Sequence, residues 1–146
     1  MTAVTFYTHV SNIEHFACRL SQRALAAGSR VLLWCGDNAQ IERLDQTLWT
    51  FEPESFLPHP IWLPGSPLPE SARLLLSGEA ELPELPPGWT VLNISPDFWS
   101  QAPAPPARIL EIIGSQAHEL SAARQRFSHY RRHGFTLTHH NMQGKA

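Results

Sequence analysis

Histidine is the residue type in this sequence whose spacing is most suggestive of chemistry. His129 and His133 are four residues apart, and His139 and His140 are adjacent. An i, i+4 pair on a helix can chelate one metal ion, but no cysteine or carboxylate lies nearby in sequence to complete a site. We interpret these histidines as solvated side chains, with a weak metal site as the alternative, and we predict no bound metal and no cofactor.

The cysteines offer a second kind of chemistry. Cys35 and a distant histidine could in principle form a nucleophile pair, but a cysteine at the end of an apolar strand is more often inert core. Cys18 and Cys35 are also too few for a disulfide framework, so we expect two buried thiols in a reducing cytosol. Because the sequence shows no Ser-His-Asp or paired-carboxylate pattern, we predict no catalytic residue and no intrinsic enzyme activity.

The basic residues near the C-terminal end suit binding rather than reaction. No acidic residue follows Glu119. The basic residues beyond it are Arg124, Arg126, Arg131, Arg132 and Lys145. On a helix, Arg124 and Arg131 share one stripe with Ser128 between them, and Phe127 flanks that stripe. Two guanidiniums beside an aromatic ring suit an acidic peptide that also carries an apolar side chain, and the alternative is an ordinary solvated face.

A second unusual feature is residues 45–59, which are too apolar for a solvated loop and too rich in proline for a strand. Trp49, Phe51 and Phe56 lie in this segment around Pro53 and Pro58. Apolar side chains on irregular backbone either fill the protein's own core or contact a partner. We predict that this set divides, with some residues sealing the sheet and some facing outward.

The elements that must position these residues alternate along the chain. Apolar runs predict strands at 4–7, 30–35, 74–76, 89–94, 108–113 and 135–138. Helical spacing predicts one helix at 13–27 after Ser11 or Asn12, a second after Asp37 or Asn38, and a third that Ser115 caps and that runs to about His133. All 13 prolines lie between Pro53 and Pro106, so the middle of the chain is expected to be rich in loops.

This order predicts an α/β fold: one three-layer domain over residues 1–146 with a mainly parallel central sheet. We expect residues 139–146 to be a frayed tail. The strand–helix junctions carry only Gly36 and Gly114, without a glycine-rich phosphate turn, so the fold is Rossmann-like without a nucleotide-binding motif. The net charge of −2 argues against binding nucleic acid with the whole surface, and no apolar run is long enough for a membrane helix.

Several motifs together resemble one known family. They are Val4-Thr-Phe6-Tyr7, Arg43-Leu44-Asp45 with Leu48-Trp49, Ser55-Phe56-Leu57-Pro58-His59, and Arg124 with Tyr130-Arg131 and Gly134-Phe135. With their order and spacing preserved over essentially the whole chain, the sequence resembles the chi subunit of bacterial DNA polymerase III. The segment from Trp49 to His59 is the most specific part of this resemblance, and the proline-rich middle is the least similar.

The resemblance implies a cytoplasmic bacterial protein that is a non-catalytic accessory subunit of the clamp loader in DNA replication. It implies a psi-subunit interface at Trp49 and Phe56. It also implies that a second surface binds the acidic, Pro-Phe-ending C-terminal tail of single-stranded-DNA-binding protein, through Arg124, Phe127, Ser128 and Arg131. DNA would then be contacted only indirectly.

Two positions of the tail-binding set depart from the family pattern. Position 127 is Phe where Tyr is familiar, which keeps the ring and loses a hydroxyl. Position 128 is Ser where Lys is familiar, which removes one positive charge; Arg126 and Arg132 are the candidates to compensate.

Other functions stay open at the level of sequence. One is a nucleotide- or small-molecule-binding α/β enzyme, and another is direct binding of single-stranded DNA by the same arginines, with Phe127 and Tyr130 stacking on bases. The sequence also leaves open whether a psi-like partner exists, or whether a helicase uses that surface.

Overall fold

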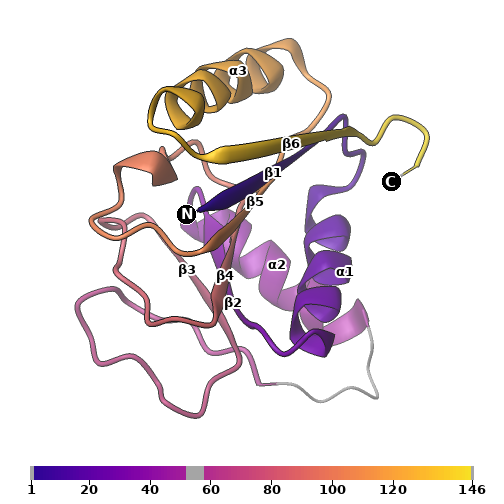
Figure 1. Cartoon of the computed structure of the whole chain (residues 1–146). Coiled ribbons are helices and arrows are strands. Elements are labelled where there is room, and N and C mark those ends of the chain that lie inside the picture. The colour runs from indigo at the N-terminus through magenta and orange to yellow at the C-terminus, as the bar shows by residue number, and fades with distance from the viewer. Residues whose placement is uncertain (1, 52–57, 146) are drawn as a thin grey trace.

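Strands and helices alternate along the chain in the computed structural model, which describes residues 2–51 and 58–145 (Figure 1). The strands are β1 (Ala3–Thr8), β2 (Arg30–Cys35), β3 (Leu74–Gly78), β4 (Trp89–Asn93), β5 (Arg108–Ile112) and β6 (Thr136–Asn141). The helices are α1 (Ile13–Ala26), α2 (Asn38–Phe51) and α3 (Ala117–Arg132), with a 3-10 turn, η1, at Trp99–Gln101.

The strands form one six-stranded sheet in the order β3-β2-β4-β5-β1-β6, and each neighbouring pair is parallel. Helices α1 and α2 cover one face of the sheet and α3 covers the other (Figure 1). The predicted three-layer α/β fold is therefore confirmed, with a sheet that is parallel throughout the described residues. None of the helices in the described ranges is long and apolar enough to cross a membrane.

Alternation along the central strands produces two apolar cores. In β2, Val31 and Leu33 belong to the core beneath α1 and α2, whereas Leu32 and Trp34 belong to the core beneath α3. All four side chains are fully buried, because both faces of a parallel strand are covered by helices. This is why residues 31–34 read as a continuous apolar run rather than an alternating one.

The helix caps follow the sequence in two helices out of three. The Asn12 side chain accepts a hydrogen bond from the His15 amide at 3.1 Å, and the Asp37 carboxylate accepts one from Gln40 at 2.7 Å. The prediction that Ser115 caps the third helix is wrong, because Gln116 occupies the cap position without a side-chain bond.

The C-terminal segment is more ordered than the sequence predicts. Strand β6 runs to Asn141, which pairs with Thr8 at the end of β1, and the Met142 amide donates to the Thr8 carbonyl at 2.8 Å. The expectation of fraying from residue 139 is wrong for 139–141, because β1 supplies backbone partners that local sequence does not reveal.

The proline-rich middle packs along the β3 edge of the sheet. The Trp62 amide donates to the Leu76 carbonyl at 2.8 Å, and the Leu76 amide donates to the Pro60 carbonyl at 3.1 Å. Trp62 is buried in the core beneath α3. The segment around Pro60 therefore covers part of an edge that would otherwise present unpaired backbone groups.

Candidate functional site

Helix α3 is held on the sheet by a buried polar network around Glu111 of β5. Tyr130 donates its hydroxyl proton to the carboxylate at 2.6 Å, and Arg126 donates from Nε at 3.2 Å. Asn93 of β4 donates from its side-chain amide to both oxygens of the same carboxylate, at 3.0 and 3.1 Å. Each of these four side chains is buried, so the network fixes the rotation of α3 about its own axis.

The electrostatics of this network are dominated by burial. Burial raises the pKa of Glu111, while Arg126 and the hydrogen bonds from Asn93 and Tyr130 act in the opposite direction. Burial, with the nearby Glu111 carboxylate, also raises the pKa of Tyr130. The network belongs to the interior and has no open side for a ligand.

The predicted tail-binding residues lie on the opposite side of α3. Arg124, Ser128 and Arg131 are exposed on this outer face of the helix. Phe127 is half-buried, with its ring centre 5.2 Å from that of Phe6 in an edge-on arrangement. The four predicted residues therefore lie on the same side of α3.

The charge missing at Ser128 is not replaced by Arg126. That guanidinium is buried and bonded to Glu111, so it does not reach the outer face. The suggestion that Arg126 compensates is therefore wrong. The sequence did not reveal this contact, because Arg126 lies between two exposed arginines on the same helix. Helical spacing shows which residues share a helix, but it does not show which of them contacts a buried carboxylate on a distant strand. Arg132 is exposed and remains available.

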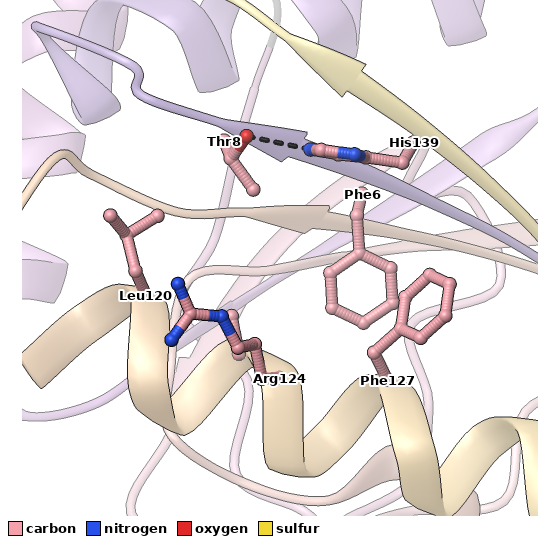
Figure 2. Close-up of a pocket in the computed structure, with 7 residues that line it drawn as sticks. Phe6, Thr8, Leu120, Arg124, Phe127 and His139 are labelled. Atoms are coloured by element: carbon pink, nitrogen blue, oxygen red, sulfur yellow. Dashed lines mark hydrogen bonds between the residues drawn. The ribbon is translucent and has the colours of Figure 1, made fainter. Parts of the chain in front are cut away.

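A cavity of about 240 Å³ opens between α3 and the sheet beside these residues (Figure 2). Its lining is contributed by α3, β1 and β6: Leu120, Ala123, Arg124, Phe127, Phe6, Thr8 and His139. Apolar side chains form most of the wall, the Arg124 guanidinium lies at one side, and a Thr8–His139 hydrogen bond of 2.7 Å closes the other (Figure 2). Such a cavity suits an aromatic or aliphatic side chain that is next to a negative group.

Sequence reasoning identified only the α3 wall of this cavity. Phe6 and Thr8 are two residues apart on β1 and so share a face, which was the available signal. His139 pairs with Phe6 in the register of β1 and β6. Its position was missed because residue 139 was assigned to a frayed tail.

The second predicted surface is centred on Trp49, near the C-terminal end of α2. Its side chain is 43% exposed, and its ring centre is 4.4 Å from that of the buried His59. The His59 Nε2 atom lies 2.9 Å from Oδ1 of Asp45, one helical turn before Trp49. Trp49 thus rests on a buried imidazole and shows its other side to solvent. Phe56, the second predicted residue of this surface, lies outside the described residues.

The predicted division of aromatics in residues 45–59 holds for the described members. Phe51 is half-buried against the core beneath α1 and α2, with its ring centre 4.8 Å from that of His15. Beyond His59, Ile61 and Leu63 are 58% and 68% exposed. Sequence reasoning missed both, since it treated the middle of the chain as connection.

Another crevice lies where the chain leaves β1 and β5 for helices on opposite faces of the sheet. This is where doubly wound folds bind nucleotides. The crevice has a volume of about 380 Å³ and is lined by the 10–14 and 114–116 loops and by Glu119. The carboxylates of Glu14 and Glu119 line it, and these would repel a phosphate. This crevice gives the nucleotide alternative no support.

The other candidates for chemistry are engaged in structure. His129 and His133 stack with ring centres 4.4 Å apart, and the Nδ1 atoms bond to the Ser100 hydroxyl and to the His129 carbonyl, respectively. Within the described ranges, no three metal-ligating side chains cluster. Burial raises the pKa of both Cys18 and Cys35 to about 12, which leaves their thiols protonated and unreactive at neutral pH.

Comparison with known proteins was made for the whole chain. Residues 1–138 match the family model of the DNA polymerase III chi subunit, HolC. The chain is 30% identical to DNA polymerase III subunit chi of Pseudomonas aeruginosa, over 97% of this chain and 98% of that protein. It is 24% identical to the same subunit of Haemophilus influenzae, over 89% and 88% of the two chains, and 40% identical to that of Escherichia coli over 34% of each.

Proposed function

Because this chain belongs to the DNA polymerase III chi subunit family, whose members are accessory subunits in DNA replication, we propose that it joins two partners. One is the acidic C-terminal tail of single-stranded-DNA-binding protein, which binds the outer face of α3. The other is the psi subunit of the clamp loader, which binds the surface around Trp49. The chain would contribute no catalysis of its own and would contact DNA only through the binding protein.

The main support for binding of the acidic tail is the cavity beside Phe127. A terminal Phe side chain needs an apolar slot, and Phe6, Leu120 and Phe127 line one. The carboxylates that precede or end the tail need cations nearby. Arg124 lines the cavity, and Arg131 is exposed about two turns further along α3, with no acidic residue after Glu119. The Phe at position 127 is compatible with this role, because its contact with Phe6 uses the ring and not a hydroxyl.

The test is Arg124→Ala with a synthetic acidic peptide that ends in Pro-Phe. We expect the dissociation constant to rise at least about tenfold in calorimetry, because a charge-assisted contact contributes roughly 1.5–3 kcal/mol. Arg19→Ala is the matched control, since Arg19 is an exposed arginine on α1, across the sheet. Unchanged binding by Arg124→Ala would remove this face from consideration.

The proposed binding of the psi subunit is supported by the exposure of Trp49. An aromatic side chain that is fixed on one side and open on the other is a frequent interface anchor. Its support comes from the buried His59 and from Asp45, so the ring is held in place before any partner binds. Whether a helicase rather than psi uses this surface is decided by which protein the chain captures.

Direct binding of single-stranded DNA is the weaker alternative. It required Phe127 and Tyr130 to stack on bases, but Tyr130 is fully buried and bonded to Glu111. Only Phe127 is left, and it is half-buried against Phe6. Titration with an oligonucleotide in the absence of the binding protein checks this, and tight binding would reverse the order of the two functions.

A further inference from the structure

The α3 cavity has a second wall that carries its own ionisable group. His139 of β6 faces α3 across the opening, and its Nε2 atom is 2.7 Å from the Thr8 hydroxyl (Figure 2). The other ring nitrogen, Nδ1, has no hydrogen-bond partner among the described residues. The imidazole is thus fixed in orientation by β1 and keeps one nitrogen for a ligand.

The charges that line the cavity indicate a role for the His139 imidazole. Arg124 is the permanent cation in the lining, Ser128 contributes no charge, and Arg126 is committed to Glu111. The lining contains no carboxylate in the part of the chain that the structure describes. A cationic imidazole at His139 would therefore lack a counter-ion until an acidic ligand supplied one.

We propose that His139 is a specificity-determining residue of the tail site. Its protonated imidazole donates from Nε2 to Thr8 and from Nδ1 to a carboxylate of the bound tail. Binding then takes up a proton and becomes tighter as the pH falls. This inference rests on the proposed function of the α3 face as the site for an acidic tail.

The hydrogen bond to Thr8 explains why protonation matters. A neutral imidazole has one N–H and one lone pair. The Thr8 hydroxyl has a single proton, and Nδ1 of His9 lies 3.1 Å from the same oxygen. In the arrangement where that proton goes to His9, Nε2–H of His139 donates to Thr8, and the lone pair of Nδ1 faces the ligand and repels a carboxylate. A protonated imidazole donates from both nitrogens and satisfies both contacts. Histidine is the side chain whose ordinary titration range, about pH 5 to 8, makes such a change available near neutrality.

Other ionisable groups near His139 are few. Arg124 is the charged group that α3 brings to the cavity. From the β1 side, His9 places its Nδ1 atom 3.1 Å from the same Thr8 hydroxyl. On β6 itself, His140 stacks on Tyr7, and it belongs to the opposite face of the strand. Proton uptake on binding is thus expected to come from His139, and His9 and His140 are the residues to control for.

The experiment is calorimetric titration of the full chain with the acidic Pro-Phe peptide, in two buffers of different ionisation enthalpy, at about pH 6.5 where histidine is half-titrated. The dependence of the observed enthalpy on the buffer measures proton uptake, which a purely structural residue does not change. We expect net uptake by the unmodified protein and about fivefold tighter binding at about pH 5.5 than at about pH 8, the size of a partly exposed ion pair.

Three variants make the result decisive. His139→Gln should lose both proton uptake and pH dependence while it keeps the affinity seen at high pH. His139→Lys should bind tightly at both pH values, because its charge does not titrate in this range. His140→Gln and His9→Gln are the matched controls and should behave like the unmodified protein.

The outcomes separate this inference from the function on which it rests. If Arg124→Ala leaves binding unchanged, the proposed tail site is wrong. If Arg124→Ala weakens binding but His139→Gln retains the proton uptake, the tail site stands and the role of His139 is overturned. Loss of uptake in His140→Gln or His9→Gln instead would also overturn it.

Discussion

The Glu111 carboxylate joins helix α3 to the sheet. It is fully buried and receives bonds from two side chains of α3 that flank Phe127 in sequence, Arg126 and Tyr130. Removing one partner of a buried ion pair leaves the other charge uncompensated, which costs more than the pair itself contributes. The stability of α3 on the sheet therefore depends on buried groups beneath the helix.

Glu111→Gln is predicted to lower the free energy of unfolding by about 3–5 kcal/mol, because Arg126 would stay buried without a counter-charge. Urea unfolding followed by circular dichroism measures this. Glu119→Gln is the matched control, since that carboxylate is half-exposed and accepts a 3.3 Å bond from the Gly114 amide. The double variant Glu111→Leu, Arg126→Met should recover much of the loss, and a single variant that loses less than about 1 kcal/mol would contradict the buried-charge argument.

At the level of the element, strands β2 and β3 approach each other closely at Gly78. Gly78 pairs with Cys35 in the parallel register, and a Cβ atom at Gly78 would lie 2.2 Å from the Cys35 carbonyl oxygen. Backbone atoms cannot move aside as a side chain can. A methyl group here would have to separate the two strands at their carboxyl ends.

Gly78→Ala is therefore predicted to destabilise the protein by more than about 2 kcal/mol in urea unfolding. Gly36→Ala is the control, because a Cβ atom there meets its nearest neighbours at 3.5 Å, an ordinary contact distance. It follows β2 directly, so the two changes lie at the same edge of the sheet. Equal stability of the two variants would show that the strands separate more easily than the register implies.

The helices and strands were largely predictable, because the signals that define them lie within short stretches of sequence. Apolar runs and caps such as Asn12 and Asp37 are short-range signals, so α1, β2 and β4 begin at or next to the expected residues. The end of β6 was not predictable, because Asn141 is ordered by pairing with Thr8 at the other end of the chain. The cavity was half predictable for the same reason: helical spacing gave the α3 wall, while the β1 and β6 walls depend on contacts between distant segments.

On the scale of the whole molecule, the two proposed surfaces lie at opposite edges of the sheet. The cavity is formed against β1 and β6 at one edge, and residues 60–62 run along β3 at the other. Three strands, β2, β4 and β5, lie between β3 and β1 in the sheet, and β6 lies beyond β1. Partners on the two edges would not compete for the same residues.

Independence of the two surfaces is therefore predicted. Trp49→Glu should abolish capture of the psi subunit in a pull-down, because a charge would replace the exposed ring, and it should leave peptide affinity within about twofold, since distant sites are energetically additive. Arg124→Ala is the reciprocal control, with psi capture intact. Loss of both activities in Trp49→Glu, with a lowered melting temperature, would show that Trp49 acts on folding instead.

The sheet order also has a consequence for how the protein is made. β1 is the first strand in the chain, yet its neighbours in the sheet are the last two, β5 and β6. During synthesis β1 cannot pair with its neighbours until β5 and β6 have been made, whereas β2, β3 and α2 can already assemble. The wall that holds His139 is completed last. A nascent chain that stops before Thr136 could display Trp49 and yet form no cavity, so tail capture would be confined to chains whose translation has passed β6.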